Sequence, residues 1–398
     1  MQFSEVIGQI KVRDQLVSMV QHNRVSHAQL FLASEGTGGL PMALAFAQYI
    51  VCEQVKATRN PQSTSGIGLF GDEEVEEKAF PTEACGKCSA CTKAAQFIHP
   101  DIHFSFPIFV RKPGEKPTCD MFMAKYREFL KLSPYSNNYD WLQFAGAENK
   151  QGNINVHECQ DITRKLSLKS FESDYKILIM WMPEMMGNEG NRLLKLIEEP
   201  PANTLFIFVA ENEERILQTI QSRTQLIKFP PLAPKDMELA LMERNNCAPE
   251  LAKQLSVIAH GNFHEAVKML QHADDSHEVM LRTWLNAIVT VNLSAQMKWI
   301  DAMSKTGREP QKQFLQYFTQ LMQQSIRLST VPDEQVSTSD FAQRLTNICD
   351  VSQLAAIIEE IEKAIYYIER NANPKMLFHA LTIKIYHVIK HRVVMEVI

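Results

Sequence analysis

Residues 27–54 read HAQLFLASEGTGGLPMALAFAQYIVCEQ, an apolar run followed by a glycine-rich turn and a second, longer apolar stretch. The run HAQLFLAS (27–34) predicts a short buried strand. The stretch PMALAFAQYIVCEQ (41–54) predicts a helix, because Pro41 suits the first turn of a helix. A strand, a glycine loop and a helix in this order form the setting of a phosphate-binding P-loop.

The glycine loop lacks the two side chains that a working P-loop needs. The pattern G-x-x-x-x-G-K-[ST] supplies a lysine for the β- and γ-phosphates and a hydroxyl for Mg²⁺. Ala33 stands at the first glycine position, whereas Gly36 and Gly38 keep the glycines of the loop. Gly39 and Leu40 replace the lysine and the hydroxyl residue. We therefore expect a degenerate loop without a functional ATP site.

Two further apolar runs predict more of the sheet. KILIMWM (176–182) and NTLFIFVAEN (203–212) are continuous in apolar residues, as buried strands of a parallel sheet are. Between them, NEGNRLLKLIEE (188–199) predicts a helix that ends before two prolines. The alternation of strands and helices indicates an α/β fold with a parallel sheet.

The composition divides the chain into three expected parts. Residues 1–230 carry the predicted strands, residues 231–276 predict a small helical unit, and residues 277–398 show helical patterns almost throughout. Two stretches look inserted. Residues 58–78 are polar and acidic and predict a mobile loop. Residues 108–152 predict loops on both sides of one helix.

The bulk composition is that of an ordinary soluble protein. The 398 residues are 45% hydrophobic and 22% charged, with a formal net charge of −5. This charge argues against a protein that coats nucleic acid by itself, because phosphate binding requires a clustered basic surface. The start of the chain has no apolar signal-peptide region, and no apolar run reaches the roughly 18 residues of a membrane span. We expect a cytoplasmic protein with no membrane partner.

Three of the eight cysteines form a compact motif, ACGKCSAC, which places Cys85, Cys88 and Cys91 at C-x₂-C-x₂-C spacing. Three thiolates so spaced can hold one tetrahedral zinc ion, and a fourth ligand would close a structural site. Cys52 is the expected fourth ligand, and His99 is the alternative. An iron–sulfur cluster, or thiols with no metal at all, remain open at this point.

The order of the motifs resembles the delta-prime family of bacterial DNA polymerase III clamp-loader subunits, which belongs to the AAA+ superfamily. The run LLKLIEEPP followed by NTLF is the most specific part of the resemblance. The matching segments, besides the cysteine motif, are VIGQ (6–9), SHAQLFLASEGTGG (26–39), HPD (99–101), YKILIM (175–180), NRLLKLIEEPPANTLFIFVAEN (191–212), ILQTIQSRTQLIKF (216–229) and ERNANPKMLFHALTIKI (369–385).

The resemblance implies a RecA-like AAA+ core, a helical lid and a helical collar, with the collars of five subunits packed in a ring. It implies that the partners are the clamp-loader ATPase subunits and the delta subunit, and through them the sliding clamp and primer–template DNA. The chain would belong to the DNA-directed DNA polymerase holoenzyme, a nucleotidyltransferase, without polymerase activity of its own.

The chain departs from active relatives at two further ATPase positions. Where they carry Asp-Glu after the second strand, this chain has Trp181 and Met182, and Glu184 comes two residues late. His264 stands where the lid of an active subunit carries a phosphate-sensing arginine. We expect no intrinsic ATPase activity. The alternatives are an active AAA+ ATPase and a zinc-containing adaptor that binds nucleic acid directly.

One catalytic residue of the family remains. The segment SRT (222–224) resembles the Ser-Arg-Cys motif with which clamp-loader subunits present an arginine finger to a neighbour, with Thr224 in place of cysteine. The resemblance implies that Arg223 acts in trans. The alternative is a solvated or capping arginine. Glu198 and Glu199 precede Pro200 and are expected to be structural.

Overall fold

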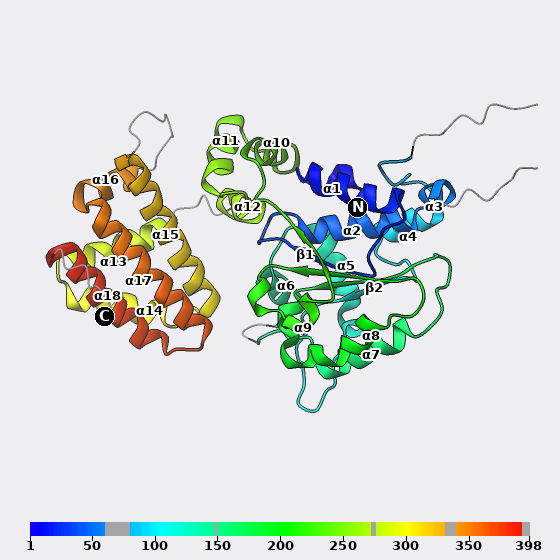
Figure 1. Cartoon of the computed structure of the whole chain (residues 1–398). Coiled ribbons are helices and arrows are strands. Elements are labelled where there is room, and N and C mark those ends of the chain that lie inside the picture. Colours follow the sequence, from blue (N-terminus) through cyan, green and yellow to red (C-terminus); the bar gives the residue numbers. More distant parts are fainter. Residues whose placement is uncertain (60–79, 148–149, 272–275, 331–339, 392–398) are drawn as a thin grey trace, which may run out of the picture. The chain divides into compact units, whose positions relative to one another are not determined.

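The computed structural model describes residues 1–59, 80–147, 150–271, 276–330 and 340–391 (Figure 1). The chain divides into two compact units, Met1–Lys268 and Met269–Ile398. Most of the expected lid thus belongs to the same unit as the core, and the predicted three-part boundaries stay a prediction. Of the expected loop at 58–78, the first two residues end a helix and the rest lies outside the described residues.

The first unit is built on one five-stranded parallel sheet in the order β2-β3-β4-β1-β5. Leu30 in the interior strand β1 lies opposite Phe208 of β4 on one side and Leu226 of β5 on the other. The strands are β1 (Ala28–Leu32), β2 (Ile102–Ser105), β3 (Lys176–Trp181), β4 (Thr204–Ala210) and β5 (Gln225–Lys228). The expected α/β fold is confirmed. The short strand β2 was not predicted, because four residues give too brief an apolar run.

Helices cover both faces of this sheet (Figure 1). One face packs against α1 (Ile10–Gln21), α2 (Gly39–Val51), α4 (Ser89–Ala95), α5 (Met123–Leu132) and α6 (Asn138–Ala145). The other packs against α7 (Val156–Leu166), α8 (Leu194–Glu198) and α9 (Gln218–Gln221). The alternation within the strands explains the two cores, since Ile177 and Ile179 face the first group while Leu178 and Met180 face the second. The remaining helical elements of this unit are η1 (Phe3–Glu5), α3 (Glu53–Arg59), η2 (Cys119–Phe122), η3 (Pro183–Leu193), η4 (Glu213–Arg215), α10 (Pro234–Asn245), α11 (Pro249–Ile258) and α12 (Phe263–Gln271).

Two predicted helices were wrong in their extent. The first half of the expected helix at 188–199 belongs to the 3₁₀ element η3, which is kinked at Gly187 (φ 51°, ψ −137°), and only α8 is α-helical. Glycine and asparagine residues in this stretch weaken an α-helix. The expected helix at 41–54 breaks at Cys52, whose backbone is extended (φ −62°, ψ 125°).

The segment 108–152 is more structured than its sequence indicates. It contains two α-helices, α5 and α6, where one was predicted. Helix α6 begins at an N-cap, Asn137, whose side chain accepts a hydrogen bond from the backbone N–H of Asp140 at 3.0 Å. Trp141 is fully buried, and its indole N–H donates to the carbonyl oxygen of Pro107 at 2.7 Å. The segment is therefore part of the core, not a set of loops around one helix.

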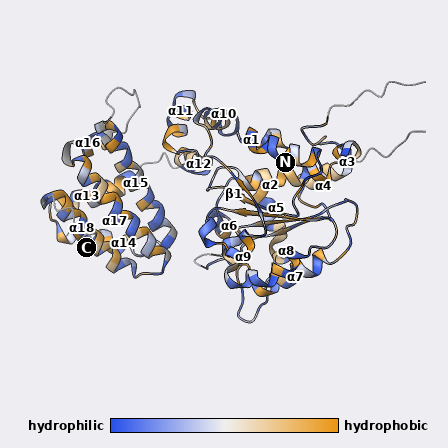
Figure 2. Ribbon diagram, in the orientation of Figure 1, coloured by the Kyte–Doolittle hydropathy of each residue, from blue (hydrophilic) through white to orange (hydrophobic). Residues whose placement is uncertain are grey.

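The second unit consists of helices in the residues that the structure describes. A stacked pair, Trp284 and Trp299, with ring centroids 4.5 Å apart, lies in its core beside Phe314 and Phe378. Hydrophobic and hydrophilic residues alternate along these helices, as amphipathic helices around a core require (Figure 2). The helices are α13 (Ser276–Val289), α14 (Leu293–Met303), α15 (Arg308–Thr330), α16 (Asp340–Ile348), α17 (Val351–Glu369) and α18 (Pro374–His391). Across the described ranges, no helix has both the length and the apolar character needed to span a bilayer.

Candidate functional site

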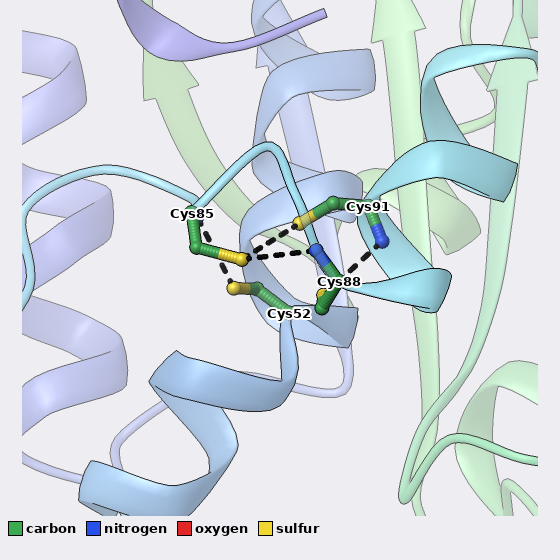
Figure 3. Close-up of side chains that lie close together, drawn as sticks. All are labelled: Cys52, Cys85, Cys88 and Cys91. Carbon is green, nitrogen blue, oxygen red and sulfur yellow. Dashed lines mark hydrogen bonds between the residues drawn. The ribbon is translucent and has the colours of Figure 1, made fainter.

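Four cysteine thiols converge at the end of α2 (Figure 3). Their sulfur atoms all lie within 4.8 Å of one another. Cys52 comes from the break between α2 and α3, Cys85 and Cys88 come from the loop before α4, and Cys91 lies in α4. The break at Cys52 thus turns its side chain to the other three. The sequence predicted this set, and the structure brings all four together.

The spacing of the sulfur atoms fits a tetrahedral metal ion. Zinc bound at about 2.3 Å from each of four sulfurs sets the sulfurs about 3.8 Å apart. The sulfurs of Cys85 and Cys91 are 3.9 Å apart. Backbone N–H groups also point at sulfur, since Cys85 donates to the sulfur of Cys52 at 3.3 Å and Cys88 donates to that of Cys85 at 3.4 Å. These donors favour thiolates, the form of cysteine that binds metals.

The electrostatics of Cys52 point the same way. A hydrogen bond with Cys91, together with the N–H of Cys85, lowers the pKa of Cys52 to about 4, although burial raises it. The same contact with Cys52, together with burial, raises the pKa of Cys91. One thiolate thus forms readily in this cluster, and a bound cation would stabilise the others.

The N-terminus of the chain covers the cysteine loop. The Gln2 side chain donates to the carbonyl oxygen of Ala84 at 2.7 Å, and the carboxylate of Glu83 accepts from the backbone N–H of Phe3 at 2.9 Å. Gly86 has a φ of 68°, and a Cβ at this position would come within 2.7 Å of the Gln2 amide. Only glycine therefore suits this point of the motif.

His99, the alternative fourth ligand, lies elsewhere. Its Nδ1 accepts a hydrogen bond from the backbone N–H of Asp101 at 3.2 Å, and its Nε2 is 3.3 Å from the carboxylate of Glu172. It is absent from the group of four side chains that could share one ion. Its surroundings give it a structural part beside β2.

The glycine loop is packed against its own chain. The carbonyl oxygen of Gly36 accepts from the N–H of Phe263 at 3.2 Å. A Cβ at Gly36 would lie 1.9 Å from the Asn262 side-chain oxygen, and a Cβ at Gly39 would lie 2.4 Å from the Cβ of Ala33. Leu40, where Mg²⁺ would need a hydroxyl, is buried in the core. Residues 33–40 of this loop include no lysine and no arginine.

His264 is engaged with the segment that was expected to be an insertion. Its Nε2 lies 2.7 Å from a carboxylate oxygen of Asp140, and Lys268 is 3.4 Å from the other. Tyr135 packs edge-on against Phe263 with ring centroids 5.2 Å apart, and its hydroxyl accepts from the N–H of Ile7 at 2.7 Å. Sequence reasoning missed Tyr135 and Asp140, although the N-cap pattern at 137–140 marks the start of a helix.

The two residues at the end of β3 that the resemblance aligns with Asp-Glu are apolar. Trp181 and Met182 are buried, and Met182 turns the chain with a φ of 60°. Glu184 faces the end of β4, where its carboxylate accepts from the N–H groups of Glu211 at 2.5 Å and Asn212 at 2.9 Å. Burial raises the pKa of Glu184.

Arg223 follows α9 at the surface, and its side chain is 35% exposed. Its Nε donates to the carboxylate of Glu198 at 2.6 Å, and its Nη2 lies in ion-pair contact with the same oxygen. Its Nη1 donates to the carbonyl oxygen of Thr219 at 2.8 Å and to the hydroxyl of Ser222 at 3.1 Å. The sequence singled out both Arg223 and Glu198 without pairing them.

The first unit combines a five-stranded parallel sheet with a glycine loop between β1 and α2, and the second unit is helical in its described residues. A family model described as "DNA polymerase III, delta subunit" matches residues 68–233. The chain is 26% identical to the DNA polymerase III subunit delta' of Bacillus subtilis over 261 residues, which is 66% of this chain and 59% of that protein. It is 23% identical to the delta' subunit of Escherichia coli over 221 residues, 55% of this chain and 46% of that one.

A third relative is the gamma/tau subunit of Mycobacterium tuberculosis, 26% identical over 244 residues, 60% of this chain and 30% of that protein. The chain thus matches less than two thirds of the length of these relatives. Among solved structures, a gamma subunit-related protein of Thermotoga maritima is 14% identical with a TM-score of 0.38, and covers 94% of this chain and 98% of its own. The chain is similar to delta-prime-type clamp-loader subunits, and the expected resemblance is confirmed.

Proposed function

We propose that this chain is a clamp-loader subunit of the delta-prime type that does not hydrolyse ATP. It would take part in loading a sliding clamp onto primed DNA during replication, together with ATPase subunits and a delta subunit. The names of its relatives support the clamp-loading role. The observation that carries the ATP-incompetent part is the glycine loop, where Gly39 and Leu40 replace the side chains that hold phosphate and Mg²⁺.

Two other positions support the same conclusion. Phosphoryl transfer depends on cations and Mg²⁺ ligands that neutralise the charge of the transferring group. The end of β3 offers Trp181 and Met182 at these positions, and both are buried. His264 is already paired with Asp140 of the same chain. At the positions of the lysine, the hydroxyl ligand and the sensing arginine, a nucleotide would instead meet Gly39, Leu40 and His264.

Arg223 is the residue with which this chain would contribute to ATP hydrolysis. It lies at the surface between α9 and β5, so a neighbouring subunit can reach it. In the ring, its guanidinium would stabilise the charge that develops on the γ-phosphoryl group of a neighbour's ATP. A planar guanidinium suits this role better than a lysine, because it offers several donors in a fixed geometry.

The four cysteines would hold one structural zinc ion. Four protein thiolates fill a tetrahedral coordination sphere, so no position is open for a substrate or a water molecule. The ion would fix the break between α2 and α3 to the loop before α4. It would also hold Glu83 and Ala84 where the N-terminal residues bind them.

Titration calorimetry with MgATP, alongside an assay for phosphate release, tests the absence of a nucleotide site. The isolated chain should show neither micromolar binding nor turnover. An ATPase subunit of the same complex provides the positive control. Tight binding together with turnover that Glu184→Gln abolishes would instead identify an active AAA+ ATPase.

A further inference from the structure

The side chain of Arg223 is held by two segments of its own chain. Glu198, the last residue of α8, accepts a hydrogen bond from Nε on a carboxylate oxygen that also lies in ion-pair contact with Nη2. Thr219 and Ser222 receive the two bonds from Nη1. A guanidinium carries five N–H donors, one on Nε and two on each terminal nitrogen. Three donors are therefore engaged in hydrogen bonds within the chain, and the N–H groups of Nη2, which lies in ion-pair contact with Glu198, are left for another acceptor among the contacts that the structure describes.

The position of Glu198 is unfavourable for a carboxylate unless a cation lies beside it. Helix α8 ends at Glu198, and the negative end of a helix dipole repels an acidic side chain. Arg223 supplies the compensating charge, although 25 residues separate the two in sequence. Pro200, which cannot continue the helix, keeps the end of α8 at this place. The pair therefore connects the helix between β3 and β4 to the segment that leads into β5.

We infer that Glu198 is a positioning residue for Arg223. Its carboxylate fixes the plane of the guanidinium, so the N–H groups of Nη2 keep one direction. This inference rests on the proposed role of Arg223 as an arginine finger. An arginine that must find its orientation during each turnover loses part of its effect, whereas a held one meets the phosphoryl group already oriented. Glu198 itself would touch neither the nucleotide nor the transferring group.

The charge and the length of Glu198 both matter to this role. In Glu198→Gln, an oxygen acceptor remains but the charge-assisted bond to the guanidinium is lost. In Glu198→Ala, the whole Nε edge of Arg223 is released. A misplacement of about 1 Å at a catalytic group can cost as much as about 100-fold in rate. We expect the loss of kcat in Glu198→Gln to be at least half of the loss in Arg223→Ala. The loss of kcat in Glu198→Ala should be nearly as large as that in Arg223→Ala.

The matched control is Glu199→Gln. Glu199 is the next residue, is exposed, and has no described contact with Arg223. Its substitution removes the same charge from the same helix end. It should leave the rate at the wild-type level. The double variant Glu198→Gln/Arg223→Ala should be no slower than Arg223→Ala alone, because a positioning residue has no effect once the group that it positions is gone.

The experiment is ATP hydrolysis, stimulated by the clamp and primer–template DNA, in the complete reconstituted complex. For each variant, kcat and KM for ATP are measured, and assembly and melting temperature are checked. The expected result is a lower kcat in Glu198→Gln at unchanged KM and unchanged assembly. If Arg223→Ala lowers kcat while Glu198→Gln and Glu198→Ala match the wild type, the inference is overturned and the proposed function stands. If losses add in the double variant, Glu198 acts elsewhere and the inference also fails. An unchanged kcat in Arg223→Ala would overturn the proposed finger and this inference together.

Discussion

Ala33 and Gly39 form a packing pair that replaces the glycine and lysine of a working P-loop. A Cβ placed on Gly39 would lie 2.4 Å from the Cβ of Ala33 and 3.2 Å from Cγ1 of Val209. The first contact is far too short, and Ala33 is buried after β1, where its N–H donates to Ala210 at 2.9 Å. Gly39→Ala should therefore destabilise the chain by about 1–3 kcal/mol through overpacking.

The effect of Gly39→Ala on stability should change sign when Ala33 is replaced by glycine. In an Ala33→Gly background, only the 3.2 Å contact with Cγ1 of Val209 remains, which a small shift of that side chain relieves. Alanine is a better helix residue than glycine by up to about 1 kcal/mol. The coupling between the two substitutions should be about 2–3 kcal/mol. Each kcal/mol should shift the melting temperature by about 2–4 °C in a unit of this size.

Calorimetric melting of the wild type, both single variants and the double variant measures this coupling. Gly152→Ala is the matched control, because a Cβ there would meet Leu142 and Pro107 at 2.9 Å instead of Ala33. Its effect should simply add to that of Ala33→Gly. Additive effects for Gly39→Ala and Ala33→Gly would show that the loop relaxes freely and would refute the packing argument.

Three further predictions concern the cysteine cluster, the contact between Asp140 and His264, and Arg223. Elemental analysis should find one zinc ion per chain. Cys52→Ser should lower the zinc content, whereas His99→Ala should not. Full zinc content in Cys52→Ser would assign the fourth ligand elsewhere. Burial raises the pKa of Asp140, but the contact with His264 and the charges of His264 and Lys268 lower it by more. The pKa of Asp140 therefore lies below its usual 3.8. Its charge therefore stabilises the fold above about pH 4, and this stabilisation is lost as the pH falls towards the lowered pKa. Asp140→Asn should lower the free energy of unfolding by about 1 kcal/mol at pH 7. Urea unfolding should show that this difference from the wild type shrinks below pH 4. A difference that is constant with pH would contradict the charge argument. Arg223→Ala should slow hydrolysis in the assembled ring without impairing assembly, and Arg223→Lys should not restore the rate; full activity in either variant would make Arg223 a structural residue.

The sheet and the cysteine cluster were open to prediction because their signals are local. Buried parallel strands such as β3 and β4 are continuous in apolar residues, and three of the four cysteines lie within seven residues. Helix α6 was missed because eight residues give little periodicity, and its burial through Trp141 depends on a distant carbonyl oxygen at Pro107.

Pairs that form only on folding could not be read from the sequence. Glu198 and Arg223 each stood out as a charged residue next to a motif, and neither pattern states that the end of α8 faces α9. The same holds for Asp140 and His264, which are 124 residues apart and meet because α6 and α12 both approach the glycine loop. The sequence analysis singled out Glu198, Arg223 and His264 but not Asp140. Only the fold shows which of these residues lie together.

Clamp loading by the complete complex, measured with and without this chain, tests the central claim most directly. The sliding clamp should be loaded onto primer–template DNA with ATP only when the chain is present, and the chain alone should neither hydrolyse ATP nor hold DNA with a salt-dependent affinity. Undiminished loading by a complex that lacks the chain, or tight DNA binding by the chain alone, would contradict the account.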